Sequence, residues 1–378
     1  MGIDAAPASQ ATLEIDLAAV ARNWNALRER LAEGSECGAV LKADAYGLGA
    51  AEVAQALGKA GCRRFFVAHL GEALALRNIV PSKSRIFVLN GVLEGEEQGY
   101  AADNIVPVLN DPGQVQRWSR HAGKVGRSLL AAIHVDTGMS RLGMTPAEAT
   151  ALATSRKSME GIALAYVMSH LARAEEAVEM NREQLAALKA LQARWPGIPA
   201  SLANSSGIFL GEAWHLDLVR PGAALYGINP VPGKPNPQAC VATLSASVLQ
   251  VRDIAPAQTV GYGATWQASR ESRVALLGAG YKDGIPRRFS SEPGRPSAEV
   301  AVDGLRCPVV GRISMDMMAV DVTEVPVGRV RQGTRMEIVG DTITLEEAAS
   351  RAGTISYELL ARLGSRFARA YTGAATGG

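Results

Sequence analysis

The feature that most constrains this chain is an alternation of short apolar runs with longer amphipathic stretches, which extends from Glu14 to about Ala239. Such alternation is typical of βα units on a parallel sheet, where a helix covers each strand before the next one begins. Eight units fit into about 225 residues, close to the usual size of a (β/α)8 barrel. The predicted strands are 39–41, 64–68, 85–89, 105–109, 129–135, 163–168, 201–203 and 216–219.

The first predicted helix carries its own start signal. Asp16 is a residue type that caps helices, and Val20, Trp24, Leu27 and Leu31 follow it at helical spacing. We expect this apolar stripe to face the barrel. Further helices are predicted over residues 146–158 and 175–194, where leucines recur on one face.

A proline-rich segment over residues 229–237 ends this rhythm, because proline continues neither a helix nor a central strand. We therefore predict a barrel domain over residues 1–239 and a mostly-β domain over 240–378, leaving open that the first residues pack on the β domain. Thr344 has the pattern of a helix cap, and a helical stretch is predicted from there toward Arg369 with a break near Gly353. The predicted strands of this domain are 243–252, 273–277, 298–302, 307–310, 318–322 and 335–339.

Composition excludes several classes of function. Lys plus Arg number 39 and Asp plus Glu 37, so the chain has no excess of positive charge to hold nucleic acid or an anionic membrane. No run of 18 apolar residues and no secretory leader occurs, so we expect a soluble, cytoplasmic protein with no membrane partner. The cysteines form no Cys-x-x-Cys pair, which predicts reduced thiols and no metal site; they are Cys37, Cys62, Cys240 and Cys307.

Reactive side chains stand where the predicted strands end, which is where barrels of this class place their active sites. These residues are Lys42, His170, Asn204 and Arg220. A lysine in a barrel mouth is costly to bury alone, so Lys42 either belongs to an ion pair or has a chemical role.

The turns after strands seven and eight are rich in small residues and hydroxyls. Ser205 follows the seventh strand, and Gly222 and Ala223 follow the eighth. Such turns are either ordinary connections or a phosphate site built from hydroxyl and backbone N–H groups. A lysine amine, a phosphate site and an arginine in one barrel mouth together indicate pyridoxal phosphate bound to the lysine as a Schiff base.

Six segments carry a resemblance that covers nearly the whole chain. The chain is similar, in family order, to bacterial alanine racemases. The matching segments are Ala39-Val-Leu-Lys-Ala-Asp-Ala-Tyr-Gly-Leu-Gly49, Asp136-Thr-Gly-Met-Ser-Arg-Leu-Gly143, Arg220-Pro-Gly-Ala-Ala-Leu-Tyr-Gly227, Val260-Gly-Tyr-Gly-Ala-Thr-Trp266, Gly280-Tyr-Lys-Asp-Gly284 and Gly311-Arg-Ile-Ser-Met-Asp316.

The resemblance implies a homodimeric enzyme that interconverts L- and D-alanine and supplies D-alanine for peptidoglycan. It makes Lys42 the lysine that carries pyridoxal phosphate and serves as the base on one face of the substrate. Tyr262 is the base on the opposite face, supplied by the β domain of the partner subunit. Racemisation needs both bases, because the α-proton leaves from one side and returns from the other. His170 and Arg220 form a network that reaches this tyrosine.

The remaining roles also follow from the resemblance. Arg220 faces the pyridine nitrogen of the cofactor, and Asn204 is grouped with the cofactor-side residues. Arg141 and the backbone amide of Met315 bind the substrate carboxylate. Tyr281 is a gate residue of the substrate channel, and Asp316 supports that region. The residues expected on the phosphate side are Tyr46, Ser205, Gly222, Ala223 and Tyr357.

Two positions depart from the family pattern. Many members have a carbamate-modified lysine where this chain has His134, so the anion that would orient Arg141 is missing; we expect a bridging anion such as chloride instead. Ser314 stands where a cysteine is frequent. Two rival functions are a pyridoxal-phosphate decarboxylase, against which Arg220 argues, and a non-catalytic cofactor-binding barrel, against which the second domain argues.

Overall fold

The computed structural model describes residues 9–292, 294 and 296–373, which form two compact units. The barrel unit contains Val20–Ala239. The β unit combines the described residues up to Ala19 with those from Cys240 onward. Residues 9–19 therefore group with the β unit rather than with the barrel.

The barrel unit has nine parallel strand segments that occupy eight positions in a ring. Only Gly38 separates β2 from β3; β2 pairs with β10 and β3 pairs with β4, so the two segments act as one strand that closes the ring. A Cβ on Gly38 would lie 3.0 Å from the Phe66 ring, so glycine allows this crowded passage. The segments are β2 (Glu36–Cys37), β3 (Ala39–Val40), β4 (Arg64–Val67), β5 (Arg85–Val88), β6 (Val106–Leu109), β7 (Leu129–His134), β8 (Ile162–Met168), β9 (Ala200–Ser201) and β10 (Leu218–Val219).

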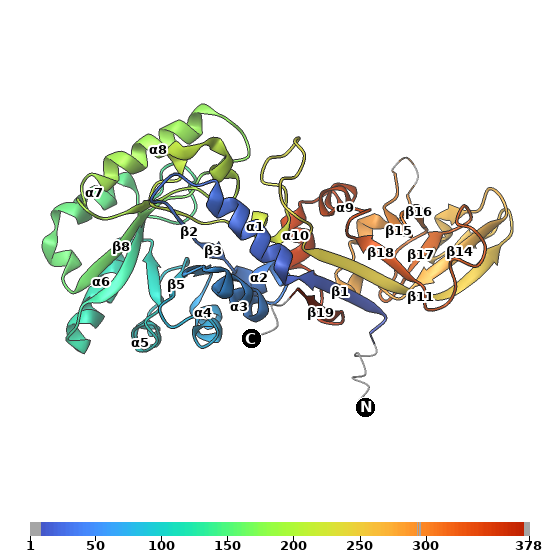
Figure 1. Cartoon of the computed structure of the whole chain (residues 1–378), viewed down its shortest axis with the longest axis horizontal. Helices are drawn as coiled ribbons and strands as arrows, with labels where there is room; N and C mark the ends of the chain where they lie inside the picture. Colours follow the sequence, from blue (N-terminus) through green and yellow to red (C-terminus); the bar gives the residue numbers. More distant parts are fainter. Residues whose placement is uncertain (1–8, 293, 295, 374–378) are drawn as a thin grey trace. The chain divides into compact units, whose positions relative to one another are not determined.

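Helices surround these strands (Figure 1), and the predicted (β/α)8 barrel is confirmed. Asp16 Oδ1 accepts from the Ala19 N–H at 2.9 Å, so the predicted cap is present, and Trp24 is buried with its indole donating to Gly38 O. The last two strands are followed by 3₁₀ turns instead of α-helices. The elements are α1 (Leu17–Glu29), α2 (Lys42–Gly47), α3 (Ala50–Ala60), α4 (Leu70–Arg77), α5 (Glu97–Ala102), α6 (Pro112–Val125), α7 (Pro146–Thr154), η1 (Arg156–Met159), α8 (Glu179–Gln192), η2 (Ser206–Leu210), η3 (Glu212–Trp214) and η4 (Ala223–Tyr226).

Aromatic and branched side chains fill the inside of the barrel. Phe66 on β4 and Phe87 on β5 are fully buried and stack with their ring centroids 4.8 Å apart. Val40, Val106 and Met168 belong to the same buried cluster. The interior is therefore a packed core.

The β unit contains a sheet in the order β14-β17-β16-β15-β18-β11-β1-β19. The long strand β11 also pairs with β14, so six of these strands close on themselves, while β1 and β19 continue from β11. The elements are β1 (Ala11–Asp16), β11 (Ala242–Ile254), β12 (Thr259–Val260), η5 (Tyr262–Ala264), β13 (Trp266–Gln267), β14 (Ser272–Leu277), η6 (Tyr281–Asp283), η7 (Arg287–Phe289), β15 (Glu299–Val302), β16 (Leu305–Val310), β17 (Met318–Asp321), β18 (Arg335–Val339), α9 (Leu345–Ala352), α10 (Ser356–Ala361) and β19 (Ala368–Thr372).

Two strands of the β unit differ from the sequence expectation. The helical stretch predicted toward Arg369 is wrong at its end, because residues 368–372 form β19 and pair in parallel with β1. No strand was predicted over residues 11–16, although Leu13 and Ile15 alternate with polar residues and are fully buried. Each of these short strands is stabilised by its neighbour in the sheet.

None of the helices in the described residues is long and apolar enough to cross a membrane. All four cysteines lie in the described part and are free thiols. Within the described ranges, no three His, Cys, Asp or Glu side chains gather as metal ligands.

Candidate functional site

Lys42 begins a turn of unusual handedness directly after β3 and Leu41. Residues 43–46 all have φ between 53° and 60°, which makes this a short left-handed helical turn built from non-glycine residues. Such conformations cost energy and persist only where surrounding contacts impose them. Burial lowers the pKa of the half-buried Lys42 amine, the Arg141 charge lowers it further, and Glu72 acts in the opposite direction.

Glu72, which sequence analysis missed, holds this turn. Its carboxylate accepts from the backbone N–H of Ala43 and from that of Ala68 at the end of β4, each at 2.7 Å. Two strand ends are thus tied to one carboxylate on α4. The only local signal was an acidic residue in the first turn of that helix, and this is common in helices for other reasons.

The turns after β9 and β10 form a cradle of hydrogen-bond donors. The buried Ser205 Oγ accepts from the N–H groups of Gly222 (3.0 Å) and Ala224 (3.1 Å), which leaves its own hydrogen free to donate. The N–H of Ala223 has no partner within the described residues. Asn204 Oδ1 accepts from Gly207 N–H at 2.9 Å and so shapes the first of these turns.

Tyr46 closes one side of this cradle. A Cβ on Gly222 would lie 2.5 Å from Tyr46 Oη, so glycine is required for the phenol to approach this closely. The Tyr46 ring packs against Tyr226 with centroids 4.8 Å apart, and Tyr226 donates to Val40 O at 2.8 Å. The left-handed turn therefore places Tyr46 beside the cradle.

Arg220 follows β10 and is buried, with 5% of its surface exposed. Its Nη1 donates to Ser201 Oγ at 2.5 Å, and its Nη2 donates to Ser169 O at 2.7 Å. Burial lowers the pKa of Arg220 to about 10, so the guanidinium stays charged at neutral pH. Its Nε has no partner among the described residues.

His170, two residues after the end of β8, lies against Arg220. Arg220 Nη2 donates to His170 Nδ1 at 3.3 Å, and since a guanidinium only donates, the hydrogen of the neutral ring is on Nε2. Burial holds the pKa of His170 well below its usual range, and the charges of Arg220 and Arg141 lower it further. The ring is therefore a neutral donor at its outer nitrogen.

His134 ends β7, and Arg141 lies in the exposed loop that follows. Burial lowers the pKa of His134 to about 4, with further lowering by Arg220 and Arg141 and an opposing effect of Asp136. At neutral pH His134 is uncharged, so it does not form a pair of cations with Arg141 that an anion such as chloride would bridge.

The β unit carries the other predicted residues, and several of them are exposed. Tyr262, at the start of η5, is 72% exposed, and it lines a cavity of about 290 Å³ together with Tyr281 and Arg312. Met315 is 51% exposed, and its N–H has no partner among the described residues. Ser314 Oγ donates to Met317 O at 2.8 Å, so this serine holds the turn that presents Met315.

Asp316 and Tyr357 are also in the β unit. Arg366 donates to Asp316 at 2.8 Å and to the buried Asp283 at 2.6 Å, and Asp283 in turn accepts from Gly280 N–H at 2.9 Å. These contacts fix the turns around Met315. Tyr357 is half-buried on α10. The predicted residues therefore fall into one group at the barrel mouth and another in the β unit.

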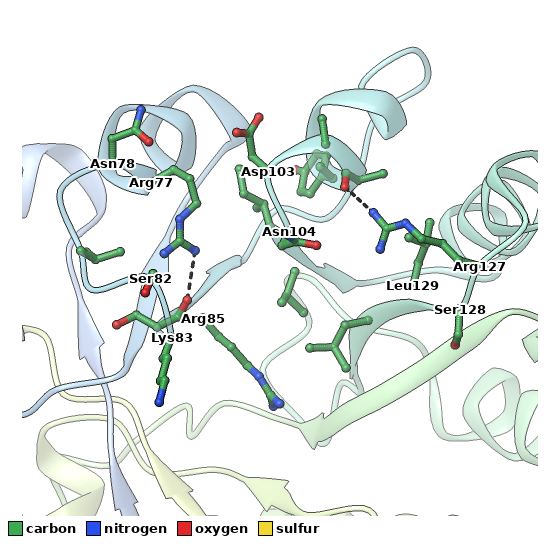
Figure 2. A pocket seen from close by; sticks show the side chains of 18 of the residues that line it. Arg77, Asn78, Ser82, Lys83, Arg85, Asp103, Asn104, Arg127, Ser128 and Leu129 are labelled. Carbon is green, nitrogen blue, oxygen red and sulfur yellow. Dashed lines mark hydrogen bonds between the residues drawn. The ribbon is translucent and has the colours of Figure 1, made fainter.

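A larger cavity, of about 790 Å³, opens at the opposite end of the barrel. It is lined by Arg85 at the start of β5 and Leu129 at the start of β7, and none of its lining residues is a predicted site residue. Figure 2 shows Arg77 and Arg127 at this cavity, where each donates to a backbone carbonyl. Barrels of this class carry their active sites at the other end, so this cavity is not the candidate site.

Comparisons with known proteins agree with this geometry. Residues 15–230 match the family described as alanine racemase, N-terminal domain, and residues 241–371 match alanine racemase, C-terminal domain. The chain belongs to the alanine racemase family. It is 46% identical to the alanine racemase of Rhodospirillum rubrum over 97% of both chains. It is also 45% identical to the catabolic alanine racemase of Agrobacterium fabrum, over 97% of this chain and 93% of that one.

A solved structure of the family is similar throughout. Alanine racemase from Bartonella henselae with covalently bound pyridoxal phosphate has a TM-score of 0.90 and 39% identity, over 97% of this chain and all of that one. Three residues that contact the site were not predicted from the sequence: Glu72, Ser201 and Asn110. Glu72 binds the turn after Lys42, Ser201 Oγ accepts from Arg220, and Asn110 Oδ1 lies 2.8 Å from His134 Nδ1. Each of these contacts joins separate strands, so it leaves no local pattern in the sequence.

Proposed function

We propose that this chain is an alanine racemase that interconverts L- and D-alanine with pyridoxal phosphate held on Lys42. The observation that carries this proposal is the grouping of a lysine amine, a donor-lined cradle and the Arg220–His170 pair at one end of a barrel of this family. The Bartonella henselae relative, with its covalently bound pyridoxal phosphate, supports it.

The residues present fit the cofactor. Ser205 has a free hydroxyl hydrogen, Ala223 has a free N–H, and Tyr46 stands beside Gly222, which together suit a phosphate group. These groups would hold the phosphate of the cofactor, and Asn204 shapes the turn that carries Ser205. Arg220 would face the pyridine nitrogen of the bound cofactor, and its charged guanidinium would disfavour a proton on that nitrogen.

Bound pyridoxal phosphate supplies the electron sink that stabilises negative charge at the α-carbon. Lys42 takes or returns the α-proton on one face of the substrate, and its lowered pKa increases the fraction of amine able to accept a proton. Arg141 binds the substrate carboxylate through charge-assisted hydrogen bonds, and the N–H of Met315 from a partner subunit completes that contact.

The second base is Tyr262 of a partner subunit, so the enzyme is a homodimer with shared active sites. Tyr262, Tyr281 and Met315 are exposed apolar side chains in one chain, and such groups mark interaction surfaces. The Nε2–H of His170 donates to the phenolate oxygen of that tyrosine and so favours its charged form. Tyr281 and Asp316 shape the entrance to the site.

The decisive test incubates purified protein with L-alanine and pyridoxal phosphate and measures D-alanine with a stereospecific assay. D-alanine should form until both enantiomers are equal, and no D-alanine formation rejects the proposal. We further propose that the enzyme works in the cytoplasm and supplies D-alanine for peptidoglycan. One relative is named a catabolic alanine racemase, so the supply role needs a test of its own. A D-alanine auxotroph that expresses the chain should grow without added D-alanine.

A further inference from the structure

The loops that enter β5, β6 and β7 surround the cavity of about 790 Å³ at the N-terminal ends of these strands, here called the loop cavity. Lys42, His170 and Arg220 follow the opposite, C-terminal ends of their strands, so the loop cavity shares none of them. Its volume lies within the range of about 300–1,000 Å³ that is usual for small-molecule sites. The proposed function gives this cavity no role.

The lining of the loop cavity carries four cations and a single carboxylate. Arg77 ends α4, Lys83 precedes β5 and Arg85 begins it, and Arg127 lies in the loop before β7 (Figure 2). The carboxylate belongs to Asp103. None of these five side chains forms an ion pair within the described residues. The excess of positive charge favours an anionic ligand.

Two of these arginines are held in place and still have N–H groups to offer. Arg77 donates through Nη1 to Ser84 O at 3.0 Å and through Nη2 to Pro81 O at 3.2 Å. Arg127 Nη2 donates to Ala101 O at 2.6 Å, and its Nε and Nη1 have no partner in the described part of the chain. A guanidinium that is already fixed loses little freedom when its remaining N–H groups bind an oxyanion.

Two buried hydrogen-bond donors also line the loop cavity. Ser84 is 4% exposed and Trp118 is fully buried. Neither the Ser84 hydroxyl nor the Trp118 indole N–H has a hydrogen-bond partner among the described residues. Buried polar groups without a partner are rare and costly. Because an indole N–H only donates, a ligand that satisfies it must offer an acceptor, which agrees with the positive charge of the lining.

The rest of the lining is mostly apolar. Val80, Ile105 and Leu129 belong to this part. Tyr100 adds an aromatic ring, and its hydroxyl is already used, since it donates to Gly91 O. A ligand that matches both parts of the lining has an oxyanion and an apolar body.

We propose that the loop cavity binds a small organic phosphate, whose phosphate contacts the cationic side chains and whose organic part contacts the apolar lining. A phosphate monoester has close to two negative charges near neutral pH and three acceptor oxygens, so it matches four cations better than a carboxylate does. This inference does not rest on the proposed function. The cradle proposed for the cofactor follows β9 and β10, at the other ends of the strands.

Calorimetry on the holoenzyme, in which the cofactor fills the cradle, tests the proposal at constant ionic strength. Phenyl phosphate should bind at one site per chain with a Kd below about 1 mM. The double variant Arg85→Gln/Arg127→Gln should raise this Kd at least about 10-fold, because charge-assisted hydrogen bonds are lost.

The matched control is Arg120→Gln/Lys124→Gln. It removes the same two charges from exposed positions of α6 that do not line the cavity, and it should leave the Kd unchanged. The absence of saturable binding to the parent protein overturns the proposal. An equal loss of affinity in the two double variants also overturns it, because only the net charge of the chain would then matter.

Two further probes separate the charged and apolar parts of the ligand. Inorganic phosphate has a similar charge but no apolar body, so its Kd should be at least about fivefold higher than that of phenyl phosphate. Phenol has the ring without the phosphate and should bind more weakly still. Equal affinity for the two phosphates would make this a site for the free ion and would overturn the organic phosphate. Phenol that binds as tightly as phenyl phosphate would overturn phosphate recognition.

A spectroscopic measurement locates the bound probe. The chain has five tryptophans, and the indole N–H signal of Trp118 can be assigned as the one that disappears in Trp118→Phe. This signal should shift as phenyl phosphate saturates the site. The signal of Trp24 is the internal control and should stay, because its indole donates to Gly38 O and Trp24 is not part of the lining. Saturable binding that leaves the Trp118 signal in place occurs at another site and overturns the proposal.

Discussion

The barrel mouth and the exposed face of the β unit place their functional residues in opposite environments. Arg220 is 5% exposed and makes several hydrogen bonds, and Ser205 is buried with two backbone donors bound to it. Tyr262 is 72% exposed and Met315 51% exposed. The barrel residues are positioned by their own chain, whereas the β-unit residues present apolar surface to solvent.

In the proposed homodimer, this difference corresponds to a division of labour between subunits. A buried, hydrogen-bonded site is preorganised and can hold a cofactor in a single chain. Exposed aromatic and methionine side chains remove their apolar surface from water only when another protein surface covers them. We therefore expect cofactor binding to follow the barrel alone and racemisation to require two chains.

The largest effect should come from Lys42→Ala. Loss of the Lys42 amine should abolish nearly all racemase activity and the yellow, borohydride-reducible attachment of the cofactor. Absorbance spectra and mass spectrometry after borohydride treatment measure the attachment. Cofactor that is still covalently attached to the variant would show that another lysine carries it.

The comparison between the two regions is tested most directly by mixing inactive chains. Lys42→Ala and Tyr262→Phe are each expected to be inactive, but a hybrid dimer has one site with both parental residues. Random exchange in an equal mixture makes about half of the dimers hybrids, so about a quarter of parental activity should return. Orthogonal affinity tags confirm that hybrids form. Confirmed hybrids without activity would place both bases on one chain.

A smaller effect is expected from Gly222→Ala, which tests the barrel cradle alone. The new Cβ would lie 2.5 Å from Tyr46 Oη, so the phenol or the turn must move. We expect affinity for pyridoxal phosphate to fall about 10- to 100-fold, the cost of roughly 1–3 kcal/mol for a disturbed polar contact. Fluorescence titration of apoprotein measures it. Gly123→Ala on α6 is the control, because a Cβ there meets no atom within 4 Å.

The smallest expected effect is the pH dependence of stability that His134 gives to the barrel unit. The pKa of His134 is about 4 in the folded protein and about 6.5 when unfolded, so on acidification the unfolded chain binds this proton first. The stability that His134 contributes is present above about pH 6.5 and is lost as pH falls toward 4, by at most about 1.4 kcal/mol per pH unit. His134→Gln should flatten the fall of Tm in this window. An identical pH profile would contradict the depressed pKa.

Local patterns in the sequence predicted the barrel because strand and helix periodicity depends on neighbouring residues. The position of Lys42, His170 and Arg220 after strands could be predicted in the same way, as could the caps at Asp16 and Thr344, whose side chains accept from N–H groups three residues on. The assignment of chemical roles required the resemblance to a family, since a lysine or tyrosine alone is compatible with simple packing.

Contacts between distant segments decided the rest. Strand β19 exists because residues 368–372 pair with β1, and the left-handed turn at residues 43–46 persists where the Glu72 carboxylate binds both the turn and the end of β4. The charge and tautomer of His134 depend on Asn110 and on burial in the folded barrel. Periodicity and caps are short-range, so the sequence alone determined them; hydrogen-bond partners and desolvation arise only when the chain is folded, so the tertiary structure decided them.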